Sequence, residues 1–118
     1  MSTHAFIARR QTDGDVVGIY CQFDGYPSGV GKRLRENYSS DLSLHALLAL
    51  GDISSLGDTT ESTTAYHRDR GEDYRPARVY KTAYEALSEE GASYAYVFED
   101  DGSWKTYDRN GKELKDSV

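Results

Sequence analysis

Apolar and polar positions near the start of the chain predict two β-strands. The stretches 4–10 and 16–23 are rich in Ile, Val, Phe and Tyr, residues that fit a pleated, half-buried surface. Asp13 and Gly14 lie between them, and this dipeptide accepts the positive φ angles of a tight hairpin turn. We therefore expect the two strands to pair in antiparallel fashion.

The apolar spacing then changes to that of helices. Val30, Leu34 and Tyr38 recur at every fourth position, which predicts a short amphipathic helix. A second helix, rich in Leu and Ala, is expected over residues 42–50. Gly51 follows it directly and can adopt the left-handed conformation that ends a helix.

The next segment, 52–75, is polar and has no sustained period. It predicts a long loop, and a loop of that length in a compact domain is usually functional or disordered. Pro76 suits the first turn of a helix, so we expect a third helix from there to Gly91. Its buried stripe would consist of Val79, Tyr80, Ala83, Tyr84 and Leu87.

Alternating residues return in the C-terminal third and predict a β-meander. Tyr94, Tyr96 and Phe98 alternate with smaller or polar residues. Turn dipeptides at 101–102 and 110–111 separate this strand from expected return strands over 104–107 and 112–115.

Together these elements predict an α+β fold with the order ββαα-loop-αββ. We expect an antiparallel sheet of four to five strands with about three helices packed on one face. The 118 residues fit one domain, 1–118, with the long polar loop at about 52–75.

The charge and cysteine content narrow the function classes. A formal net charge of −6 argues against direct binding to nucleic acid or to an anionic membrane, because both require basic patches. The single cysteine, Cys21, excludes an internal disulfide, and no apolar run suits a signal peptide or a membrane span. We therefore expect a cytoplasmic protein, and the oligomeric state stays open.

A glycine-rich turn before the first expected helix is the first candidate site. Unpaired amides at a helix start attract anions, and two cations follow the turn, so a phosphate is one hypothesis. The alternative is a structural corner in which Gly25 takes a positive φ angle and Asp24 bonds the turn backbone. The candidate ligand-binding residues are Asp24, Gly25, Tyr26, Gly29, Gly31, Lys32 and Arg33.

The stretch 66–72, Tyr-His-Arg-Asp-Arg-Gly-Glu, is the second candidate. Its His67, Arg68 and Arg70 could grip a phosphate or a carboxylate and close over the glycine turn. Because its charges alternate in sign, the alternative is a solvated turn held by salt bridges.

A third candidate is an acidic surface that binds a basic partner protein by imitating a nucleic-acid backbone. Ordinary solvation of a helix end and a hairpin tip would explain the same carboxylates. The candidate partner-binding residues are Glu85, Glu89, Glu90, Glu99, Asp100, Asp101 and Trp104.

Metal and catalytic chemistry find no support in the residue spacing. The three histidines, His4, His45 and His67, are widely separated, and no ligand spacing typical of zinc is present. No nucleophile lies beside a matched base. We predict no catalytic residues, no metal and no cofactor.

Three stretches, 19–31, 48–57 and 66–72, resemble small phage and prophage proteins of unknown function that carry the same Asp-Gly-Tyr-Pro turn. The resemblance covers roughly residues 1–75 and implies a mobile-element protein in the cytoplasm of a bacterial host. In that setting we expect an anti-CRISPR-like inhibitor that binds a host defence protein or complex. The alternatives are a sponge for a phosphorylated nucleotide signal and, third, a small hydrolase using His67 with Asp69 or Glu72.

Overall fold

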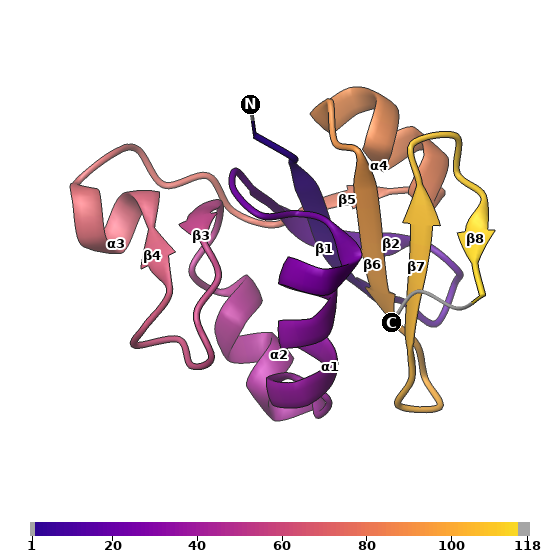
Figure 1. Cartoon of the computed structure of the whole chain (residues 1–118), viewed down its shortest axis with the longest axis horizontal. Helices are drawn as coiled ribbons and strands as arrows, with labels where there is room; N and C mark the ends of the chain where they lie inside the picture. Colours follow the sequence, from indigo (N-terminus) through magenta and orange to yellow (C-terminus); the bar gives the residue numbers. More distant parts are fainter. Residues whose placement is uncertain (1, 116–118) are drawn as a thin grey trace.

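A mixed β-sheet crosses the molecule in the computed structural model, which describes residues 2–115 (Figure 1). The strand order is β4-β3-β2-β1-β6-β7-β8, and β5 also pairs with β2. The strands are β1 Ala5–Arg10, β2 Val16–Cys21, β3 Ile53–Ser55, β4 Thr64–Ala65, β5 Arg78–Tyr80, β6 Tyr94–Phe98, β7 Trp104–Asp108 and β8 Glu113–Leu114. The helices are α1 Lys32–Asn37, preceded by a π-helical turn at Pro27–Gly31, α2 Asp41–Leu48, α3 Tyr66–Arg70 and α4 Ala83–Glu90.

The α+β class is confirmed, but the predicted antiparallel sheet of four to five strands is wrong. The β1–β6 and β2–β3 pairs are parallel. Parallel neighbours need a long connection between them, and α1 with α2 supplies the one from β2 to β3. A second crossover runs from β5 through α4 to β6, so the element order also differs from the prediction.

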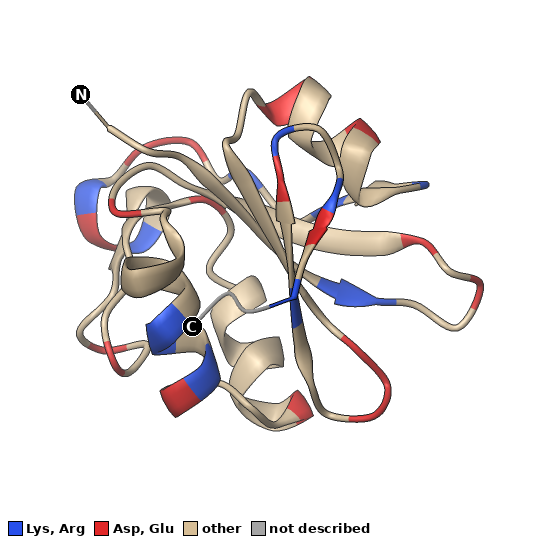
Figure 2. Cartoon of the chain, turned by 45° about the vertical axis from the view of Figure 1, so that its right-hand side comes forward, with Lys and Arg blue, Asp and Glu red and all other residues tan. Residues whose placement is uncertain are grey.

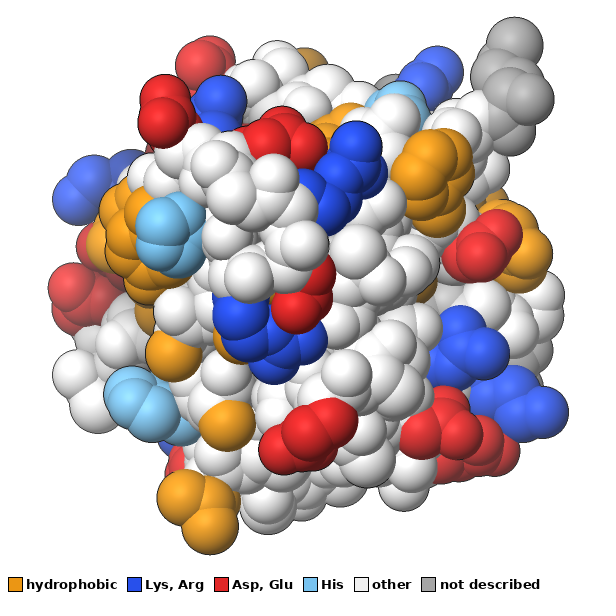
Figure 3. Space-filling model, turned by 90° about the vertical axis from the view of Figure 1, so that its left-hand side faces the viewer, with side chains coloured by type: hydrophobic (Ala, Val, Ile, Leu, Met, Phe, Trp, Pro, Cys, Tyr) orange, Lys and Arg blue, Asp and Glu red, His pale blue; other side chains and the backbone are white. Residues whose placement is uncertain are grey.

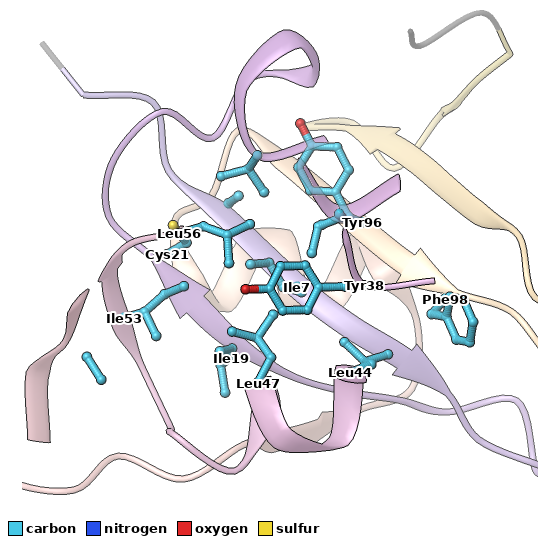
Figure 4. Packing of buried hydrophobic residues seen from close by; sticks show 14 residues of the cluster. Ile7, Ile19, Cys21, Tyr38, Leu44, Leu47, Ile53, Leu56, Tyr96 and Phe98 are labelled. Carbon is cyan, nitrogen blue, oxygen red and sulfur yellow. The ribbon is translucent and has the colours of Figure 1, made fainter. Parts of the chain in front are cut away.

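The helices cover both faces of the sheet, not one face as predicted. Side chains along β1 alternate between two cores because a strand has a period of two. Ala5 and Ile7 pack with residues of α1 and α2, as Figure 4 shows for Ile7, whereas Phe6 and Ala8 pack with residues of α4. Figure 1 shows α4 on the opposite side of the sheet from α1 and α2.

The predicted N-terminal hairpin is confirmed. β1 and β2 pair in antiparallel fashion with Ile7 opposite Ile19, and Gly14 has a φ of +94°. The apolar stripe of the first helix is also confirmed, because Val30, Leu34 and Tyr38 are buried.

The helix predicted from Pro76 to Gly91 is wrong in its first half. Residues 78–80 form β5 and pair with residues 16–18 of β2. Val79 and Tyr84, both placed on the buried stripe, are 61% and 58% exposed. The tertiary pairing of a three-residue strand overrides the helical spacing, as it often does for short segments.

The residue before α4 is a sequence signal for the start of this helix. The side chain of Thr82 accepts a hydrogen bond from the Glu85 backbone N–H at 3.0 Å, which is a standard N-cap. Gly91, at φ +67°, ends the helix as predicted.

Residues 52–75, predicted as a loop, contain β3, β4 and α3. These elements are three, two and five residues long, too short for any periodicity to develop. The C-terminal meander of β6, β7 and β8 is confirmed, with Gly102 and Gly111 at positive φ in its turns.

No helix within residues 2–115 has the length and apolar character that crossing a membrane requires.

Candidate functional site

Strand β2 pairs with two different strands, β5 and β3, on the side that faces away from β1. Residues 16–18 of β2 pair with β5, whereas Cys21 pairs with Ile53 of β3. Between these two partners, the backbone N–H of Tyr20 donates a hydrogen bond to Asp52 Oδ1 at 3.0 Å. Binding crevices commonly open where strands of a sheet diverge, and one opens here.

The crevice is a cleft of about 870 Å³ on the sheet face that carries α4. A volume of this size suits a small ligand or the side chains of a partner. We call it the tyrosine cleft, and its lining residues are Tyr20, Asp52, Tyr66, Gly71, Glu72, Asp73, Arg75, Arg78, Tyr80, Glu89 and Glu90.

An ion-pair network centred on Arg78 forms part of the cleft lining. Its guanidinium donates two parallel hydrogen bonds to Glu90, at 2.8 and 2.7 Å, and contacts Asp52 Oδ1 at 3.0 Å. Tyr80 donates its hydroxyl to Glu90 as well. The side chains of Asp52 and Glu90 are only 8% and 9% exposed, so both depend on Arg78 to offset the loss of hydration.

The same contacts set the protonation states in the cleft. The hydrogen bond with Glu90 raises the pKa of Arg78 further above its usual value. Burial acts to raise the pKa of Glu90, but the hydrogen bonds from Arg78 and Tyr80 outweigh it and lower that pKa. Burial raises the pKa of Tyr20 and of Tyr80. At neutral pH, Glu90 is therefore ionised and both tyrosines keep their protons.

The tyrosine cleft is acidic overall. Five carboxylates and two guanidiniums line it, for a formal charge of −3. Within the described part of the chain, Asp73 and Glu89 have no ion-pair partner, in contrast to Asp52 and Glu90. Three tyrosine rings share the cleft with these carboxylates, and tyrosine faces attract cations. Its chemistry suits a cationic group.

Neither models of known protein families, nor curated proteins, nor solved structures match this chain.

The glycine turn folds as a packed corner. The positive φ angle expected at Gly25 belongs to Asp24, at +59°, so that part of the prediction is wrong. Gly25 is instead required by close packing, since a Cβ there would lie 2.7 Å from the Thr3 carbonyl oxygen. A Cβ at Gly29 would lie 2.5 Å from the Asp24 carbonyl, and one at Gly31 would lie 2.9 Å from the Tyr96 ring.

The cations beside this turn lie in a smaller pocket of about 410 Å³. Arg33 pairs with Asp58 at 3.1 Å and donates to the Leu56 carbonyl. Lys32 lines the same pocket, but so do three carboxylates, and its formal charge is therefore −1. This balance gives an anion little attraction. The lining residues are Asp24, Tyr26, Ser28, Gly29, Lys32, Arg33, Glu36 and Asp58.

The Tyr-His-Arg-Asp-Arg-Gly-Glu stretch forms α3 and the turn after it. Arg68 pairs with Asp69 at 2.8 Å, and Arg70 pairs with Glu72 at 3.2 Å. The ring of His67 lies 2.8 Å from the Glu72 carbonyl oxygen through its Nδ1. Figure 3, which shows the face on the side of α3 and β4, has basic and acidic side chains next to one another.

The two predicted ligand motifs do not meet in one pocket. Tyr66, Gly71 and Glu72 line the tyrosine cleft, whereas Gly29 and Lys32 line the smaller pocket. Neither Arg68 nor Arg70 lines either pocket. The predicted closure of the arginines over the glycine turn is therefore absent from the described structure.

Of the seven predicted partner-binding residues, Glu89 and Glu90 line the tyrosine cleft. Glu90 is held there by Arg78 and Tyr80, and all five others have structural contacts. The carboxylates of Glu99 and Asp100 pair with Arg10 and Arg9. The remaining three are Glu85, which accepts a hydrogen bond from the Lys81 backbone, Asp101, which accepts one from Ser103, and Trp104, which packs against Phe98.

Acidic residues as a class are spread over loops, hairpin tips and α4 (Figure 2). The tyrosine cleft combines five carboxylates and three tyrosines around a cavity, against three carboxylates and one tyrosine in the smaller pocket. Within residues 2–115, no group of three or more His, Cys, Asp or Glu side chains could hold a metal ion.

Sequence reasoning missed most of the cleft. Tyr20, Asp52, Arg75, Arg78 and Tyr80 were not singled out as site residues. One signal was available, because each of the three stretches 19–31, 48–57 and 66–72 contributes at least one residue to this cleft. Their convergence becomes visible only when β2, β3 and α3 are placed side by side.

Proposed function

We propose that this protein acts without catalysis, by stoichiometric binding of a basic partner protein at the tyrosine cleft. The observation that carries the proposal is the formal charge of −3 around a cavity lined by three tyrosines. Carboxylates steer a basic partner toward the surface, and tyrosine is a common anchor residue in protein interfaces.

The resemblance to phage and prophage proteins suggests the kind of partner. Proteins that bind nucleic acid expose arginines and lysines, and an acidic surface can occupy them. We therefore propose an anti-CRISPR-like role, in which the protein blocks a basic surface of a host defence protein or complex in the bacterial cytoplasm.

The charge balance favours this proposal over a nucleotide sponge. A sponge needs free cations around the phosphate. In the tyrosine cleft, Arg75 and Arg78 both pair with carboxylates, and in the smaller pocket Arg33 does so too. A phosphate in either place would meet an excess of negative charge.

Affinity capture from a bacterial host lysate, read by native mass spectrometry, tests the proposal. Replacing the two unpaired cleft acids, as Asp73→Lys with Glu89→Lys, should remove a salt-sensitive protein partner. The matched control is Glu36→Lys with Glu61→Lys, which changes the net charge equally at exposed positions outside the cleft. Capture of no protein, or equal capture by the cleft variant and the control, would refute the proposed function.

A further inference from the structure

The two oxygens of the Asp52 carboxylate have different surroundings. Oδ1 accepts the Tyr20 N–H at 3.0 Å and contacts Arg78 Nη1, also at 3.0 Å. Oδ2 contacts Arg75 Nε at 3.4 Å, and no hydrogen-bond donor within residues 2–115 reaches it. Asp52 is therefore a nine-tenths buried carboxylate of the cleft whose second oxygen is held only by a long ion pair.

Arg75 holds that oxygen weakly. Its side chain is 68% exposed and the contact is long, at 3.4 Å, so water and side-chain entropy compete with it. Its backbone is fixed, since the Asp52 N–H donates to the Arg75 carbonyl at 3.0 Å. The guanidinium can therefore swing away from Asp52 while the chain stays in place.

We infer that Asp52 Oδ2 is the anchor point for a guanidinium group of the partner, and that Arg75 occupies this point in the free protein. This inference rests on the proposed function and names the group that the cleft recognises. Binding would exchange the internal arginine for an external one, so Arg75 acts as a built-in competitor.

A guanidinium suits the cleft better than an ammonium does. It is planar, bonds carboxylates with two donors and stacks on aromatic rings, whereas a lysine provides a compact point charge. Arginines of the chain already make both kinds of contact with residues that line the cleft. Arg78 forms the two-donor contact to Glu90, and the guanidinium of Arg70 lies 5.3 Å from the centre of the Tyr66 ring.

An NMR titration of the purified protein with N-acetyl-arginine amide tests the inference. The amide signals of Tyr20 and Asp52 report on the anchor point. Arg75→Gln should bind the probe about fivefold more tightly than the natural protein, the factor that matches the upper range of exposed ion pairs. Arg33→Gln, which removes an arginine paired outside the cleft, should leave the affinity unchanged.

N-acetyl-lysine amide serves as the second probe and should bind more weakly than the arginine probe. Equal affinity of the arginine probe for Arg75→Gln and for the natural protein would overturn the inference, as would equal affinity for the two probes or signal changes confined to the smaller pocket. A fivefold gain without any captured protein from the lysate would refute the proposed function alone. A captured partner without that gain would refute this inference alone.

Discussion

Replacing Arg78 with alanine tests whether the cleft network holds β5 and α4 to the sheet. The change leaves Asp52 and Glu90 close together, nine-tenths buried and without their shared cation. Removing one partner of a buried ion pair costs about 3–5 kcal/mol. Because the Arg78 side chain is 24% exposed, we expect the lower end, about 3 kcal/mol of unfolding free energy.

Urea unfolding at pH 7, followed by the fluorescence of Trp104, measures this loss. The matched control is Arg33→Ala, which breaks an exposed pair with Asp58 and should cost about 0.5 kcal/mol or less. A loss for Arg78→Ala that does not exceed that of the control would refute the reasoning.

The pH dependence of the unfolding free energy independently checks the direction in which Arg78 shifts the pKa of Glu90. In the natural protein the pKa of Glu90 is lowered, so its stabilising contribution is present above about pH 4.3, the unfolded value, and is lost as pH falls through the folded pKa. Without Arg78, burial dominates and raises that pKa. The deficit of Arg78→Ala should therefore shrink as pH falls from 7 toward 4, and a deficit that grows would contradict this account.

Three further outcomes follow from the glycine turn and the core beneath it. Tyr96→Phe should lower the unfolding free energy by about 1–2 kcal/mol. The buried Tyr96 hydroxyl donates to the Gly25 carbonyl at 2.6 Å, and the variant leaves that acceptor unpaired. A change below about 0.5 kcal/mol in urea unfolding would argue against this role. Asp24→Val should lower the unfolding free energy by about 1–2 kcal/mol, because a β-branched residue is strained at a φ of +59°. Asp24→Gly should be tolerated there, and differential scanning calorimetry compares the two variants. The Cys21 thiol, whose pKa burial raises to about 12, should react with Ellman's reagent at pH 8 only in unfolded protein; fast reaction of the native protein would show that the strand opens.

Local sequence rules identified the elements whose signals lie within a few residues. The turn at Gly14, the stop at Gly91 and the meander turns at Gly102 and Gly111 all appear as expected, each with a positive φ angle. Gly51 also has a positive φ angle, but α2 ends at Leu48, before the predicted stop. Glycine adopts positive φ angles readily because it has no Cβ, so each of these turns can be predicted from the residue itself. The sequence therefore sufficed for the α+β class and for most of the element boundaries outside 52–82.

These local rules could not predict the short strands. β5 pairs with β2 about 60 residues earlier in the chain, and its three residues follow a proline that equally suits the start of a helix. The same holds for the parallel β1–β6 pair, which joins strands about 90 residues apart in the sequence. Contacts at such separations depend on the assembled fold and leave little trace in a local pattern.

What the sequence by itself determined is the kind of protein: an acidic α+β chain with one cysteine, no visible catalytic constellation and tyrosine-rich strands. Only the tertiary structure decided where its chemistry lies. The fold places most of the carboxylates on hairpin tips and loops. It brings Tyr20, Asp52, Arg78 and Glu90 together where the partner of β2 changes from β5 to β3. The physical reason is that ion pairs and clefts form between side chains that are near in space, and a one-dimensional pattern records only neighbours along the chain.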